Sequence, residues 1–259
     1  MALDRLGEEV RDIHADPPTR RIRLKRVGGL GLRVPVRVGR ESYPAGVDLL
    51  VDLPEWRRGV DLSRQNRALY EALSSAEGPL ELARATAEAL LKRLDYASRA
   101  EVRVRLEGLR RAPPNDSYEP YALEAFAGLD REGETLERIA VEVTATTACP
   151  CTQELLRTLF RLRGLESVGL ATHTQRARFR LEIAAHRIEG VGVEELIEVV
   201  EGGASSPVRA VLRRPQEAGL VLLMLENALL AEDAVREIAF RAASLDLPDE
   251  ATIRVTVRT

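Results

Sequence analysis

The chain contains few of the residues that bind soft metals or form cross-links. Among its 259 residues there are two cysteines, three histidines, one tryptophan and two methionines. The cysteines, Cys149 and Cys151, are separated by a single proline, which leaves little freedom to satisfy disulfide geometry. We therefore expect both to remain thiols.

Long apolar runs and an excess of one charge are also absent. No stretch of about 18 apolar residues occurs, so the sequence predicts no membrane-spanning helix. The opening Met1-Ala2-Leu3-Asp4-Arg5 does not have the features of a signal peptide, and we expect a cytoplasmic protein. Net charge is −3, with acidic and basic residues interspersed, which argues against nucleic acid as a partner.

What remains is the composition of a globular protein rich in arginine. Hydrophobic residues make up 45% of the chain and charged residues 31%, which excludes a disordered chain. Lys25 and Lys92 are the only lysines among 38 basic residues. A chain of this length can bury one large core or two domains.

Hydrophobic periodicity divides the chain into two similar halves. Each half shows strands, then helices, then a returning strand, which indicates an α+β duplication and not a parallel βαβ sheet. The loop at Pro113-Pro114 separates predicted domains over 1–114 and 115–259. The first half is expected to contain a β-hairpin over 20–40 broken at Gly28-Gly29, an extended segment over 43–53, helices within 61–97 divided at Gly78-Pro79, and a strand over 102–106. The second is expected to contain strands at 119–128, 137–147 and 174–188, helices at 193–202, 215–227 and 231–244, and a strand at 253–257.

The scarce sulfur and imidazole groups lie in one stretch of the second half. Cys149-Pro150-Cys151 is followed within 25 residues by His173. Thiolate and imidazole are ligands of zinc-like or ferrous ions, so the stretch is a candidate metal site. The spacing is not a standard zinc pattern, and cysteines packed as small apolar residues are the alternative.

Two later motifs extend this pattern. Arg213-Arg214-Pro215-Gln216-Glu217 is followed by Glu232-Asp233-Ala234-Val235-Arg236, and His173-Thr174-Gln175-Arg176 precedes both. With Cys-Pro-Cys and an opening Pro18-Thr19-Arg20, this order resembles the type IB GTP cyclohydrolases, metal-dependent enzymes that open GTP for folate-type pterin synthesis. The resemblance covers about residue 10 to the end of the chain. It implies tandem tunnelling-fold units, antiparallel sheets with helices packed on one face, assembled as a homotetramer or another homo-oligomer.

The resemblance also implies roles for individual residues. Cys149, His173 and Glu217 match metal ligands at the catalytic centre, for Zn, Mn or Fe. A bound divalent ion would make water nucleophilic at neutral pH, as attack at C8 of guanine requires. Glu217 lies near a predicted helix start, where a carboxylate is also favoured by the helix dipole, so this structural interpretation stays open.

Four further residues match positions that bind GTP. Glu232 matches the carboxylate that accepts hydrogen bonds from the guanine edge, which would discriminate against adenine. As for Glu217, a carboxylate at a predicted helix start is the structural alternative. Arg176 and Arg213 are candidates for the triphosphate, with Arg213 where the family usually has lysine, and Gln175 adjoins Arg176. Cys151 is expected to take a supporting position beside the metal.

The chain also departs from the family pattern. Members usually continue into a Glu-Ser-Ile-His-x-His tail that brings another metal-ligand histidine, whereas this sequence ends at Arg258-Thr259. The stretch 157–169 is interpreted as a partial insertion, and His14 and His186 as surface residues. The leading hypothesis is hydrolysis of GTP to formate and 7,8-dihydroneopterin triphosphate, or to a cyclic phosphate as in an archaeal-type relative. The alternatives are a nitrile reductase-like enzyme of the same superfamily and a catalytically silent binding or scaffold member.

Overall fold

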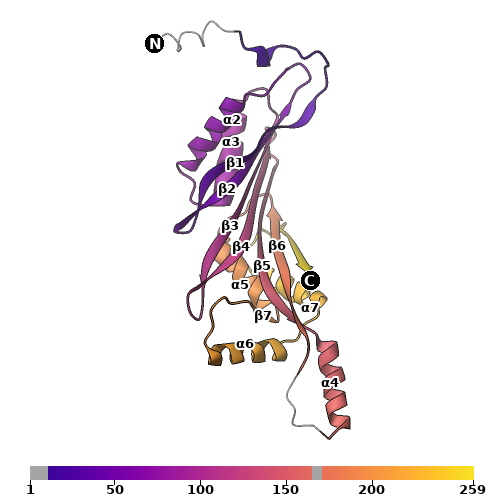
Figure 1. Cartoon of the computed structure of the whole chain (residues 1–259). Coiled ribbons are helices and arrows are strands. Elements are labelled where there is room, and N and C mark those ends of the chain that lie inside the picture. Colours follow the sequence, from indigo (N-terminus) through magenta and orange to yellow (C-terminus); the bar gives the residue numbers. More distant parts are fainter. Residues whose placement is uncertain (1–10, 165–170) are drawn as a thin grey trace. The chain divides into compact units, whose positions relative to one another are not determined.

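The computed structural model describes residues 11–164 and 171–259. The chain forms two compact units, one comprising Met1–Val104 with Ala125–Leu136 and the other Arg105–Glu124 with Glu137–Thr259. Antiparallel strands and helices in each unit confirm the α+β class (Figure 1). In the middle of the chain, Arg105–Glu124 belongs to the second unit and Ala125–Leu136 to the first. A division into tunnelling-fold units at 114/115 stays a prediction.

Unit 1 has a sheet in the order β1-β2-β3-β4, with two helices packed against it. Val47 and Leu49 of β2 are fully inaccessible, and α2 and α3 bury Leu69 and Leu90, so the core of this unit is mainly apolar. The two helices divide before Pro79, as the sequence predicted. The elements are η1 (Ile13–Ala15), β1 (Leu24–Val38), β2 (Glu41–Leu53), α2 (Leu62–Leu73), α3 (Pro79–Arg93) and parts of β3 (Arg99–Ala112) and β4 (Ser117–Asp130).

The hairpin turn predicted at Gly28-Gly29 is wrong. β1 continues through both glycines, and the turn lies beyond its end, where Gly39 has a φ of 60°. Gly28 instead permits a close approach, because a Cβ built there would lie 1.8 Å from the carbonyl oxygen of Leu49. The amide of Gly29 donates to Oε1 of Gln65 on α2 at 3.3 Å. The glycines therefore bring the strand and a helix together and do not break the strand.

Unit 2 has strands in the order β3-β4-β5-β6-β8, with the short β7 paired to β5. Phe179, Leu181 and Ile183 alternate along β6 on its buried side, where α5 and α7 supply Ile197 and Ile238. This alternation is the pattern of a sheet covered by helices on one face. The remaining elements are β5 (Thr135–Ala148), α4 (Pro150–Leu162), β6 (Thr174–Ala185), α5 (Val193–Gly202), β7 (Ser206–Pro207), α6 (Arg214–Glu226), α7 (Ala231–Ala242) and β8 (Thr252–Arg258).

Two helices of unit 2 contribute no buried residue. α4 was not predicted: its part of the stretch 157–169 was interpreted as an insertion, but helix continues to Leu162, and 165–170 lie outside the described residues. Pro150 at the first helical position is the sequence signal that marks its start. α6 is apolar on several sides, yet Val221, Leu222 and Leu223 remain exposed. Within 11–164 and 171–259, no helix is long and apolar enough to span a membrane.

The close approach at Gly28 yields a stability prediction. Gly28→Ala should lower the free energy of unfolding by about 1–3 kcal/mol, since the new methyl group must displace the backbone carbonyl of Leu49. Urea unfolding measures the effect. Gly219→Ala in α6 is the control, because a Cβ there meets nothing within 4 Å and alanine is the better helix former by about 1 kcal/mol. Equal stability of the two variants would contradict this role for Gly28.

Candidate functional site

The antiparallel register of β5 and β6 brings Cys149 and His173 together. Ala148 is the partner of Thr174, so the next residue out on each strand is Cys149 on one side and His173 on the other. The amide of Cys149 donates to the carbonyl of His173 at 3.2 Å. The Thr172 hydroxyl donates to the carbonyl of Cys149 at 2.5 Å. This second hydrogen bond holds the segment before β6 against Cys149.

Cys149 is also the residue that caps α4. Its Sγ accepts a hydrogen bond from the Thr152 amide at 3.5 Å, within the first turn of the helix. This bond, with a further one from His173, lowers the pKa of the Cys149 thiol to about 7. Amide donors and the positive end of a helix both favour thiolate. A half-buried thiol that ionises near neutrality beside an imidazole is a donor pair suited to a zinc-like ion.

The other residues of the Cys-Pro-Cys and His-x-Gln-Arg motifs lie around this pair. Cys151 is exposed in the first turn of α4. Gln175 and Arg176 begin β6 and are both exposed, opposite Thr147 and Thr146 on β5. The structure therefore brings these predicted residues close to Cys149 and His173 in the sheet.

Glu217 and Arg213 lie at the start of α6. Arg213 precedes the helix, and its amide donates to Oε1 of Gln216 at 2.8 Å. The same oxygen accepts from the Asn115 side chain at 2.8 Å, and Nε2 of Gln216 returns a bond to Oδ1 of Asn115 at 3.2 Å. Glu217 is exposed one residue further on, close to the Pro215 that the sequence placed at a helix start. The first turn of α6 is thus fixed by side-chain amide contacts to the connection between β3 and β4.

The opposite end of α6 is the end that contacts α4. Nε2 of Gln153, in the first turn of α4, donates to the carbonyl of Leu225 at 2.7 Å. Glu217 precedes Leu225 by about two turns, or roughly 12 Å along the helix axis. Cys149, His173 and Glu217 are accordingly not a group whose ligand atoms lie within 4.8 Å of one another in the described chain. The structure pairs the first two and leaves the third separate.

Glu232 is exposed in the first turn of α7, next to Asp233. No contact to its carboxylate occurs among the described residues. A carboxylate in this position is favoured by the helix dipole and is also free to accept hydrogen bonds from a ligand.

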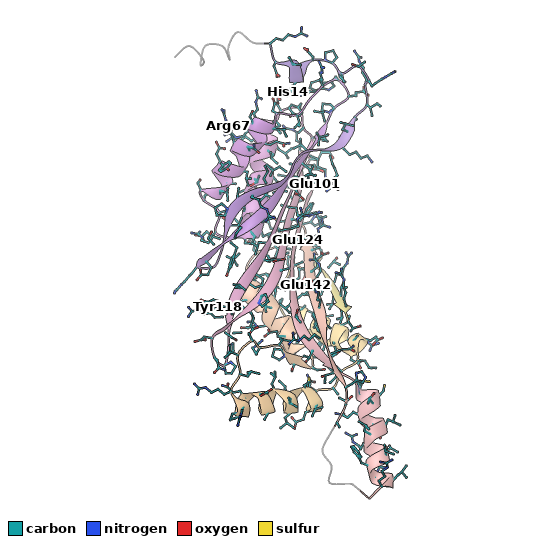
Figure 2. The ribbon with its side chains drawn as sticks, viewed as in Figure 1. His14, Arg67, Glu101, Tyr118, Glu124 and Glu142 are labelled. Carbon is teal, nitrogen blue, oxygen red and sulfur yellow. The ribbon has the colours of Figure 1, made fainter. Side chains whose placement is uncertain are left out.

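A second set of potential ligands lies in unit 1. Asp12, His14 and Asp61 place one ligand atom each within 4.8 Å of one another, which makes this group a possible metal-binding triad. Nδ1 of His14 is 3.4 Å from Oδ1 of Asp12 and 4.0 Å from Oδ1 of Asp61. Arg57, stacked on Tyr96, is 2.8 Å from Oδ2 of Asp61 and already supplies a positive charge there. His14 is exposed, as we interpreted it from the sequence, and it is also part of a polar cluster (Figure 2).

Several contacts at the site were not predicted from the sequence. Thr172 and Gln153 lie inside the segments that were singled out, but only the strand register and the helix contacts reveal their partners. Gln216 did carry a signal, since glutamine three residues after a cap position often returns to the backbone there. The Asp12, His14 and Asp61 group joins residues nearly fifty positions apart and carries no short-range signal.

The fold and the site define an α+β protein with a thiol and an imidazole paired at the end of a sheet. The chain belongs to the family described as type I GTP cyclohydrolase folE2, which matches residues 10–258. It is 40% identical to GTP cyclohydrolase MptA of Korarchaeum cryptofilum (strain OPF8), covering 98% of this chain and 88% of that relative. GTP cyclohydrolase MptA of Thermoplasma acidophilum is 29% identical, covering 95% and 88% respectively.

A solved structure with a similar fold is the uricase from Arthrobacter globiformis. It superposes with a TM-score of 0.50 at 10% identity, covering 90% of this chain and 92% of the uricase. At this identity the similarity concerns the fold alone. It agrees with the expected architecture of antiparallel sheets that carry helices, of the T-fold-like kind.

The hydrogen bonds to Cys149 predict how the thiol reacts with pH. In metal-free Cys151→Ser protein, the rate of alkylation by iodoacetamide should rise with pH and level off with a midpoint at about 7, because the folded state lowers the pKa of Cys149. Cys149→Ser is the matched control and should lack this component. A rate that keeps rising through pH 9, as for an ordinary thiol, would show that Thr152 and His173 do not stabilise the thiolate.

Proposed function

We propose that this protein is a metal-dependent GTP cyclohydrolase of the type IB kind, which hydrolyses GTP with release of formate. The observation that carries the proposal is the match to the family over residues 10–258, with relatives named GTP cyclohydrolase along nearly the whole chain. The pairing of Cys149 with His173 supports it, because two residues singled out as ligands meet at one position in the sheet.

Cys149, His173 and Glu217 would hold the divalent ion, Zn, Mn or Fe. When bound, the ion supplies a water that is nucleophilic near neutral pH. The donor set suits such an ion: the Cys149 thiol ionises at about 7, and the imidazole of His173 hydrogen-bonds to it. Within one chain Glu217 lies apart from this pair, at the exposed start of α6, so its place in the ligand set rests on the family resemblance.

The same proposal assigns the substrate contacts. Glu232 presents an exposed carboxylate that has no hydrogen bond or ion pair to residues 11–164 and 171–259, and it would accept hydrogen bonds from N1–H and the exocyclic amine of guanine. Arg176 and Arg213 are exposed guanidinium groups that would bind the triphosphate, with Gln175 beside Arg176. Hydrolysis would yield 7,8-dihydroneopterin triphosphate for folate-type pterin synthesis, or a cyclic phosphate of the same pterin.

Formate release from GTP is the test of this function. Wild-type protein supplied with Zn²⁺, Mn²⁺ or Fe²⁺ should release formate, and Cys149→Ala should abolish release while remaining folded by circular dichroism. Asp61→Asn, in the unit 1 triad, is the matched control: it should retain both formate release and the bound metal measured by elemental analysis. Phosphorus NMR of the product separates a triphosphate from a cyclic phosphate.

Two outcomes would contradict this assignment. Formate release by folded Cys149→Ala would remove Cys149 from the catalytic centre. Loss of metal and of activity in Asp61→Asn, with full metal in Cys149→Ala, would place the essential ion at Asp12, His14 and Asp61 instead.

We also propose that the protein is a homo-oligomer, with the homotetramer as the leading form. The support is the apolar surface of unit 2: α4 and α6 bury no residue within the chain, while Leu155 and Leu162 of α4 and Leu222 of α6 are more than half exposed. Exposed apolar surface of this kind is typical of a subunit contact. The family resemblance implies that a second copy of the chain covers this surface.

The oligomer proposal predicts a specific effect of charge on α6. Wild-type protein should elute in light-scattering chromatography at a multiple of 28.7 kDa, and Leu222→Arg should shift the mass toward the monomer, because a buried unpaired charge opposes association. Asn66→Arg, which adds the same charge to an exposed position of α2, is the control. A wild-type mass of 28.7 kDa would refute the proposal.

A further inference from the structure

The segment that connects β7 to α6 carries residues whose position is not set by apolar packing. α6 contributes no buried side chain, although Arg213 and Glu217 lie at its start. Hydrophobic burial is what usually fixes a helix against its domain. Some other interaction must therefore hold the first turn of α6 in place.

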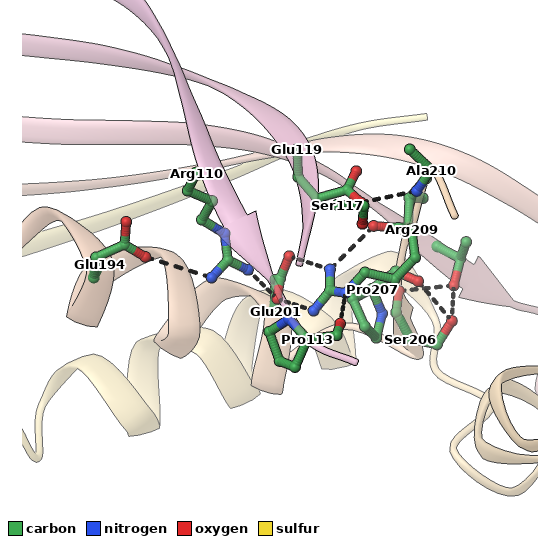
Figure 3. Close-up of polar contacts among 12 residues, drawn as sticks. Arg110, Pro113, Ser117, Glu119, Glu194, Glu201, Ser206, Pro207, Arg209 and Ala210 are labelled. Carbon is green, nitrogen blue, oxygen red and sulfur yellow. Dashed lines mark hydrogen bonds and ion pairs between the residues drawn. The ribbon is translucent and has the colours of Figure 1, made fainter. Parts of the chain in front are cut away.

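A buried ionic network provides this interaction (Figure 3). Both carboxylate oxygens of Glu201, in the last turn of α5, accept from the guanidinium of Arg209 at 2.8 Å, in a two-pronged pair. Nε of Arg209 donates to the carbonyl of Pro113 in the β3–β4 connection at 2.9 Å. The Arg209 side chain is 7% exposed, so it is committed to these contacts. One arginine thus ties the segment to a helix and to a hairpin.

Arg110 on β3 completes the charge balance of the network. Its Nη2 lies 2.5 Å from Glu201, and its Nη1 lies 3.5 Å from Glu194. Burial alone would raise the pKa of Glu201, but hydrogen bonds from Arg209 and Arg110 outweigh it and lower the pKa. Glu201 consequently remains ionised at neutral pH and keeps both arginines bound.

Contacts to the backbone continue the anchoring residue by residue toward α6. The amide of Ala210 donates to Oε1 of buried Glu119 at 2.8 Å, and the Ser117 hydroxyl donates to the same oxygen at 2.6 Å. The Asn115 side chain then donates to the carbonyl of Val211 at 3.0 Å. Every step from 209 to 211 is therefore bound to the β3–β4 region.

We propose that Arg209, held by Glu201, is a positioning residue for the first turn of α6, where it fixes Arg213 and Glu217 for the phosphates and the metal. The role in catalysis rests on the proposed function. The anchoring itself does not, since it follows from contacts within the chain. Arg209 touches neither substrate nor ion in this proposal and acts only through the segment that it holds.

Arg209→Ala tests the proposal, with Arg187→Ala as the matched control, since Arg187 also pairs with a glutamate but is half exposed. In Arg209→Ala, amide hydrogen exchange over 208–217 should accelerate, while α5 and β6 keep their protection. Affinity for Zn²⁺ should fall by about 10- to 100-fold, the usual effect of losing an outer support of a ligand. At saturating metal, KM for GTP should still be raised, and by a larger factor than the factor by which kcat falls.

Conservative variants keep the test decisive if Arg209→Ala folds poorly. Arg209→Lys keeps the charge beside Glu201 but loses the fork and the Nε bond, so it should show the same changes in part. Glu119→Gln keeps an acceptor oxygen for Ala210 and should retain near wild-type exchange, whereas Glu119→Ala should not. If the variants only lose stability, and each folded molecule keeps the wild-type KM and Zn²⁺ affinity, Arg209 is not a positioning residue.

The proposal is overturned if folded Arg209→Ala exchanges 208–217 at the wild-type rate, or if it binds Zn²⁺ and GTP as the wild type does. The failure of the proposed function gives a different result. In that case wild-type protein releases no formate with any of the metals, while the exchange rates and the Zn²⁺ affinity still decide whether Arg209 positions the segment.

Discussion

The pairing of β5 with β6 is the interaction on which the candidate site depends. Twelve consecutive residue pairs run from Glu137 opposite Ala185 to Ala148 opposite Thr174. The buried face of this pair, with Val143 against Phe179, excludes a slip by one residue, because a slip would turn every apolar side chain outward. A packed core thereby fixes the adjacency of Cys149 and His173 at the exposed end of the same strands.

The two ends of the site are held by different kinds of force. Cys149 and His173 inherit their position from the apolar sheet, and α4 adds amide donors that favour thiolate. Arg213 and Glu217 depend on ionic and amide contacts, since α6 buries nothing within the chain. Polar contacts of this kind act as a network, so removing one partner leaves another buried group unsatisfied and weakens its neighbours.

Periodicity predicted most of the fold, because apolar residues at intervals of two or of three and four directly record the burial of one face. It failed where local chemistry overrides pattern. Gly28 was interpreted as part of a turn, although the glycine is needed because a Cβ at this position would collide with the carbonyl oxygen of Leu49. α4 was missed although Leu155, Leu159 and Phe160 follow Pro150 at helical spacing, because part of the stretch was interpreted as an insertion.

The scarce cysteine and histidine residues alone made one stretch a candidate metal site, but the roles of the other site residues could be predicted only through the resemblance to a family. Nothing in the spacing of Cys149 and His173 indicates that they are neighbours, because adjacency arises from a strand register set by the whole β5–β6 face. The supporting network was invisible for a related reason: Arg110, Glu201 and Arg209 look like ordinary surface charges in an arginine-rich chain. Burial is what distinguishes them. A charged side chain that is buried away from water must be paired with an opposite charge. A buried arginine therefore marks a position where the fold holds the chain through an ion pair.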